Sequence, residues 1–114
     1  MRSYPCRVVR VVDGDTVQVV ADLGFRVSAA VDVRIVGINA PEVATADGAK
    51  ARDWAVTWVG TPAGQWPFTL ECHGPDKYGG RWLGDLIKPG GARWSADAIA
   101  AGAARAWNGR GVKP

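Results

Sequence analysis

The dipeptide Asp13-Gly14 lies between two runs rich in β-branched residues, and this feature constrains the fold more than any other. The two runs cover residues 6–12 and 16–22. An Asp-Gly pair in this setting forms the tight turn of a β-hairpin. A further apolar run at 30–38 indicates a third strand. The first third of the chain is therefore expected to form three consecutive strands.

The rest of the sequence predicts two helices and two more strands. Between residues 45 and 60, apolar residues recur every three or four positions, with Gly60 as a natural helix end. Trp54 and Trp58 are expected to anchor the core. The other predicted elements are a strand at 66–72, a glycine-rich turn at 74–80, a strand at 81–87, a short helix capped by Ser95 and ending at Gly102, and an irregular basic tail at 107–114. This order favours a β-rich α+β fold: one domain over 1–114 that forms a five-stranded Greek-key barrel, the OB-fold.

Composition narrows the class of protein further. The chain has 114 residues, 47% hydrophobic and 22% charged, which is ordinary for a soluble globular protein. No apolar run approaches the roughly 20 residues of a membrane span, and no signal-peptide segment opens the chain. We expect a cytoplasmic or phage-encoded monomer with no membrane association. The net charge of +3 biases it mildly toward anionic partners, although a solvated basic tail explains the charge equally well.

The cysteines and the histidine exclude several kinds of site. Cys6 and Cys72 fit no zinc spacing, and we expect two reduced thiols, although a disulfide can form if their strands are neighbours. His73 is the only histidine and is expected at the surface. A catalytic triad and a histidine-rich metal site are therefore excluded. Any catalysis must rely on carboxylates and guanidinium groups.

Three polar stretches lie where predicted strands end: residues 13–16, 34–42 and 76–81. They contain carboxylate, amide and guanidinium side chains. Carboxylate and carbonyl oxygens bind hard cations such as Ca²⁺, and a carboxylate beside such an ion can deprotonate a water. Arginines bind phosphate oxygens through two donors at once and stabilise a phosphoryl transition state. Together these groups favour hydrolysis of a phosphodiester.

The same stretches resemble the markers of the staphylococcal nuclease (thermonuclease-like) family, which are D-G-D-T, R-(x)4-D-x-P-E and D-K-Y-G-R. The resemblance implies an OB-fold enzyme that cuts DNA and RNA, with Ca²⁺ as cofactor in the type enzyme. By position, Asp15 resembles a calcium-binding aspartate. Arg34 and Arg81 resemble the phosphate-binding arginines, and Glu42 resembles the water-positioning general base.

The resemblance also implies a set of ligands and substrate contacts. The metal ligands would be Asp15, Asn39, the backbone carbonyl of Ala40, and Glu42 through a water. The residues beside the substrate nucleotide would be Lys77 and Tyr78.

Two departures from the family pattern bear on activity. Asn39 stands where the family has a second calcium-binding aspartate, and an amide ligand lacks the negative charge on which affinity depends. We therefore expect weaker metal binding, another cation preference, or an inactive site. In addition, Gly80 is an extra residue before Arg81, and a shift of the arginine by about 1 Å would cost on the order of a hundredfold in rate.

Each of these charged residues, taken alone, also has a purely structural interpretation. Asp13 is expected to shape the hairpin turn, Arg34 could pair with Asp15 or Glu42, and Asp76 could cap its turn. Glu42 could also stabilise the N-terminus of the following helix.

Other functional classes remain open too. The main alternative is a barrel that binds nucleic acid without cutting it, and a third is a protein-docking domain that uses exposed tryptophans.

Overall fold

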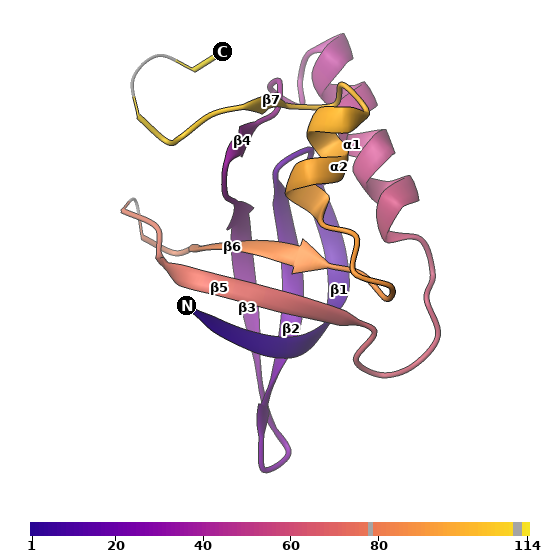
Figure 1. Cartoon of the computed structure of the whole chain (residues 1–114), viewed down its shortest axis with the longest axis vertical. Helices are drawn as coiled ribbons and strands as arrows, with labels where there is room; N and C mark the ends of the chain where they lie inside the picture. The colour runs from indigo at the N-terminus through magenta and orange to yellow at the C-terminus, as the bar shows by residue number, and fades with distance from the viewer. Residues whose placement is uncertain (78, 111–112) are drawn as a thin grey trace.

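The structure is a computed structural model that describes residues 1–77, 79–110 and 113–114. It contains a closed five-stranded barrel with two helices at one end, which confirms the predicted OB-fold-like α+β class (Figure 1). The elements in chain order are β1 (Arg2–Asp13), β2 (Thr16–Gly24), β3 (Val27–Ile35), β4 (Ile38–Asn39), α1 (Ala46–Val59), β5 (Phe68–Pro75), β6 (Trp82–Ile87), α2 (Trp94–Ala100) and β7 (Arg105–Ala106).

The barrel strands follow the order β1-β2-β3-β6-β5, and β5 pairs with β1 to close the barrel. Neighbouring strands are antiparallel except for β3 and β6, which run parallel and place Arg34 opposite Leu83. This pairing bears on the predicted site. The end of β3, which carries Arg34, lies beside the start of β6, which follows Arg81.

The predicted strand at 30–38 is displaced by three residues, since β3 has the same length but covers Val27–Ile35. The chain turns at Val36–Gly37, where Gly37 has a φ of 79° that favours glycine, and β3 ends at Ile35. The next two residues form β4, which pairs with β7 in a separate small sheet. A single strand over 30–38 would place Arg34 on the same face as Val36 and Ile38, but the turn at Val36–Gly37 separates them.

The ends of the helices are partly as predicted. Thr45 caps α1 by accepting a hydrogen bond from the Gly48 amide, and Gly60 follows the last turn. In contrast, Ser95 does not cap α2, which begins at Trp94 after Arg93. The amide and hydroxyl of Ser95 both donate to the buried carboxylate of Asp85. Because the buried Asp85 carboxylate needs hydrogen-bond donors, Ser95 lies in the first turn of α2 and not at its N-cap.

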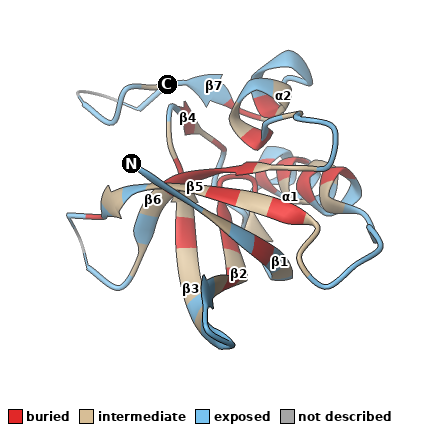
Figure 2. Cartoon of the chain, turned by 60° about the horizontal axis from the view of Figure 1, so that its bottom comes forward, coloured by how far each residue is buried: buried red, intermediate tan, exposed pale blue. Residues whose placement is uncertain are grey.

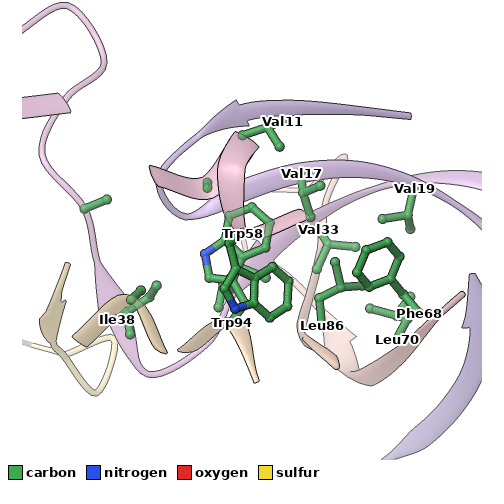
Figure 3. Packing of buried hydrophobic residues seen from close by; sticks show 14 of the residues in the cluster. Val11, Val17, Val19, Val33, Ile38, Trp58, Phe68, Leu70, Leu86 and Trp94 are labelled. Carbon is green, nitrogen blue, oxygen red and sulfur yellow. The ribbon is translucent and has the colours of Figure 1, made fainter. Parts of the chain in front are cut away.

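The core joins the barrel to both helices (Figures 2 and 3). Trp94 of α2 is fully buried, and its ring centroid lies 5.6 Å from that of Trp58 on α1. Trp58 in turn stacks on Phe68 of β5, while Trp54 is partly buried against the same cluster. Trp94 also donates from Nε1 to the carbonyl of Gly14 at 3.0 Å. The hairpin turn is therefore fixed directly to the core.

Both cysteines are free thiols, as expected. Their strands are neighbours, but Cys6 faces Phe68 and Cys72 faces Arg2, so the two thiols are not opposite each other. Burial raises the pKa of Cys6 to about 12 and keeps it protonated. His73 is exposed, 3.7 Å from the Glu71 carboxylate. Within the described ranges, neither helix is sufficiently long and apolar to span a bilayer.

Candidate functional site

The β1–β2 turn buries Asp15 and presents its carboxylate to the segment that follows β4. Asp13 accepts the Asp15 amide at 3.0 Å, the turn-shaping role expected of it. One carboxylate oxygen of Asp15 accepts the Thr16 hydroxyl at 3.2 Å, and the other accepts the Ala40 amide at 2.9 Å. Asp15 thus joins two of the three polar stretches predicted to form the site.

Arg34 contacts the same carboxylate. Its Nη2 lies 3.5 Å from Oδ2 of Asp15, and only 12% of the arginine side chain is exposed. The guanidinium also donates to the carbonyl of Ile35 at 2.6 Å and to that of Ile38 at 2.9 Å. Of the two anionic partners considered for Arg34, the structure selects Asp15. Arg34 therefore both stabilises the turn after β3 and partly neutralises Asp15.

The surroundings of Asp13 in the turn disfavour its charged form. The pKa of Asp13 is raised to about 6, first by burial and then by the neighbouring Asp15 carboxylate. Two carboxylates close together with limited access to water disfavour a second negative charge. Protonation of Asp13 relieves this cost.

Two glycines let the polar segments approach, and sequence reasoning missed both. A Cβ on Gly14 would lie 2.8 Å from the Cβ atoms of Ala40 and Ala51. A Cβ on Gly48, at the start of α1, would lie 1.7 Å from the carbonyl oxygen of Glu42. A glycine inside a predicted helix was the available signal for the second contact, because glycine there is otherwise unfavourable.

Glu42 and Asn39 are less tightly held. Glu42 is exposed, and its backbone carbonyl accepts the amide and hydroxyl of Thr45 at 3.0 and 2.6 Å. Nowhere in the described chain does a hydrogen bond or ion pair reach the Glu42 carboxylate. Asn39 is half-buried in β4, opposite Arg105. The structure thus brings Asp15, Arg34 and Ala40 together, but does not bring the Glu42 side chain into contact with them.

Arg81 lies at the turn between β5 and β6 and is already paired. Its Nε and Nη2 both donate to one oxygen of Asp76, at 3.1 and 2.8 Å, and 36% of the side chain is exposed. The Asp76 amide donates to the Arg81 carbonyl at 3.0 Å, which closes the turn. Lys77 is exposed and makes an interaction of its own. Tyr78 lies outside the described residues.

Few of the described groups are placed to hold a metal ion. Across the described residues, no three carboxylate, histidine or cysteine side chains are grouped to hold a metal ion. Of the predicted ligands, Asp15 lies in the turn, and Asn39 and Ala40 lie in the adjoining segment. A site with few charged ligands binds Ca²⁺ weakly.

Comparison with known proteins adds no assignment: no protein-family model matches this chain, and a search of curated proteins returns no match.

Proposed function

We propose that this chain is a divalent-cation-dependent phosphodiesterase that hydrolyses DNA, RNA or both, similar to the staphylococcal nuclease family. One observation carries the proposal: the Asp15 carboxylate lies 3.5 Å from the Arg34 guanidinium and 2.9 Å from the Ala40 amide. The carboxylate proposed to hold the cation, the arginine proposed to bind phosphate and the segment leading to Glu42 thus lie close together.

Each residue has a role in the proposed reaction. Asp15, Asn39, the Ala40 carbonyl and, through a water, Glu42 would hold the cation, which supplies neutralisation of a phosphate oxygen. Arg34 uses only part of its five donors on its present partners, which leaves others for the phosphate.

Arg81 and Glu42 complete the reaction. Arg81 exchanges Asp76 for a phosphate oxygen, since its side chain is exposed enough to turn. Glu42 takes a proton from a water that attacks phosphorus in line with the departing oxygen. The arginines stabilise the charge that accumulates on the five-coordinate phosphorus.

The direct test is incubation with single-stranded DNA and with RNA, in Ca²⁺, in other divalent cations and in chelator. The proposal requires cutting that the chelator abolishes and that the cation restores. Glu42→Gln removes the base but keeps the side-chain shape, so it should fold normally and lose cutting. Asp53→Asn, an exposed carboxylate on α1, serves as the matched control. Chelator-resistant cutting, or full activity of Glu42→Gln, would contradict the proposal.

A second candidate is a barrel that binds nucleic acid without cutting it. The observation in its favour is that Asp15 is already satisfied by Thr16, Ala40 and Arg34. Such a protein would bind polynucleotide with an affinity that falls steeply with salt and ignores chelator. It would release no product under any cation.

A further inference from the structure

The hairpin that joins β2 to β3 has an unusual turn. Phe25 and Arg26 have φ values of 55° and 62°, in the left-handed region that glycine, asparagine and aspartate prefer. The side chain of Phe25 is also fully exposed. A large apolar residue is thus held in an unfavourable backbone conformation without contributing to the core. Strain and exposure at the same residue suggest a role in binding.

The hairpin projects from the barrel along the long axis of the molecule (Figure 1), and a pocket with aromatic and cationic walls extends from its turn to Arg7 and Trp66. The pocket has a volume of about 380 Å³, and its walls include Arg7, Phe25, Arg26 and Trp66. The guanidinium of Arg7 lies 5.0 Å from the centre of the Trp66 ring. Asp22 also lines the pocket, but its carboxylate accepts the Gly24 amide at 3.0 Å within the turn.

The pocket lies on the same barrel face as a second hollow nearer the phosphate-binding residues. Side chains alternate across a strand, and the buried Val19 and Ala21 place Val20 on the outer face of β2. Val20 is flanked by Arg7 of β1 and Ala30 of β3. The second hollow, of about 260 Å³, includes Gln18, Asp32, Gly80 and the half-exposed Trp82 in its walls. It therefore lies between the Arg81 turn and the hairpin pocket.

We propose that Phe25, Arg26, Arg7 and Trp66 form a distal subsite for single-stranded nucleic acid. A base stacks on an aromatic ring and the arginines contact the adjoining phosphates, the usual combination in proteins that bind single strands. The inference rests on the proposed function, because the same strand would continue to Asp15 and Arg34. β2 spans nine residues, or about 30 Å, between the two sites.

The chemistry favours a nucleic acid over a lipid surface. Adsorption to anionic lipid needs a cluster of cations around the apolar tip, whereas this pocket has only two arginines, and Asp22 also lines it. Moreover, Arg7 pairs with Val20, five residues before Phe25 at the tip, and holds Trp66 beside it, so insertion of the tip alone into a membrane would leave both unused.

The experiment measures binding of a labelled single-stranded DNA of about 12 nucleotides, in chelator so that no cutting interferes. Phe25→Asn and Arg7→Gln should each weaken binding by about 10-fold, the effect expected for the loss of one stacked base or its cation. Binding of a dinucleotide, which is too short to reach both sites, should not change. Ile99→Asn, an exposed apolar residue on α2, is the control and should bind like the wild type.

Phe25→Asn provides a second readout, because asparagine adopts the left-handed conformation readily. Its melting temperature should rise while its affinity for the long strand falls, which separates loss of binding from loss of folding. Unchanged affinity in both variants would overturn the subsite, whether or not the protein cuts. Binding of anionic phospholipid vesicles through Phe25 with no binding of DNA would overturn it as well. Weaker binding by the variants of a protein that never cuts would leave the subsite standing and reject the proposed nuclease.

Discussion

Asp15 and Arg34 form a largely buried ion pair, in which Nη2 lies 3.5 Å from Oδ2 and the side chains are 11% and 12% exposed. The pair links the β1–β2 turn to the turn after β3. In the proposed activity, Asp15 would also bind a cation and Arg34 would also bind a phosphate. Both ligands would therefore compete with this ion pair. The pair is longer than a good hydrogen bond, and each member has other partners: Asp15 accepts from Thr16 and Ala40, and Arg34 donates to two carbonyls.

Replacing Arg34 with alanine should affect both stability and activity. The change removes donors from the carbonyls of Ile35 and Ile38 and leaves Asp15 without its charge partner. We expect the free energy of unfolding to fall by about 3 kcal/mol, measured by urea denaturation, in a chain that still folds. Nuclease activity should fall by orders of magnitude. Normal turnover in this variant would remove Arg34 from the proposed site.

Arg81→Ala should separate the loss of activity from the loss of stability. Its pair with Asp76 is partly exposed, so we expect a loss of stability below about 1 kcal/mol. Activity, in contrast, should fall by about 100-fold or more if Arg81 contacts the transition state. Initial rates on single-stranded DNA, compared with those of Arg93→Ala as an exposed-arginine control, measure the difference. Equal rates for the two variants would show that the Asp76 pair is only structural.

Asn39→Asp tests the proposed metal site. A second carboxylate near Asp15 restores the charge that the amide lacks, so half-maximal activity should require less Ca²⁺. Without Ca²⁺, the added negative charge should lower the melting temperature, and Ca²⁺ should restore it. Calcium titrations of activity and of melting temperature check both effects. An unchanged or higher requirement would show that residue 39 is not a ligand.

The raised pKa of Asp13 predicts a specific pH dependence of the free energy of unfolding. Its pKa is raised to about 6 in the folded chain, first by burial and then by Asp15, compared with about 3.9 when unfolded. The folded state therefore binds the proton more tightly, and this contribution is complete below about pH 4. It is lost as the pH rises to about 6. Asp13→Asn should flatten the stability profile between these values, as measured by urea denaturation at each pH. An unchanged slope would contradict the shift.

Gly48→Ala should destabilise the protein, although a change from glycine to alanine within a helix usually stabilises it. In an ordinary helix, alanine is more favourable than glycine by about 1 kcal/mol. Here a Cβ would lie 1.7 Å from the carbonyl oxygen of Glu42, so α1 or the 42–43 segment must move. We expect a loss of about 2 kcal/mol or more in the free energy of unfolding. The exposed neighbour Ala49 provides the control, since Ala49→Gly should cost only about 1 kcal/mol.

Local sequence determined most of the elements of this protein. β-Branched runs around Asp13-Gly14 predicted the first hairpin, and apolar spacing with Gly60 predicted α1 almost to the residue. These signals are local because turn geometry and helix periodicity depend on neighbouring residues. The order of elements then indicated the OB-fold-like barrel, which the structure confirms.

The tertiary structure decided which charges meet. Alternation extended the third strand through residue 38, but Gly37 ends it, and Arg34 turns instead to Asp15 and two carbonyls. Likewise, Ser95 donates to Asp85 and does not form the predicted helix cap, and Arg81 donates to Asp76. A buried charge takes whichever partner the packed chain brings within reach, and that partner is often distant in sequence. Residue spacing can nominate the members of a site, whereas their pairing depends on how the barrel closes.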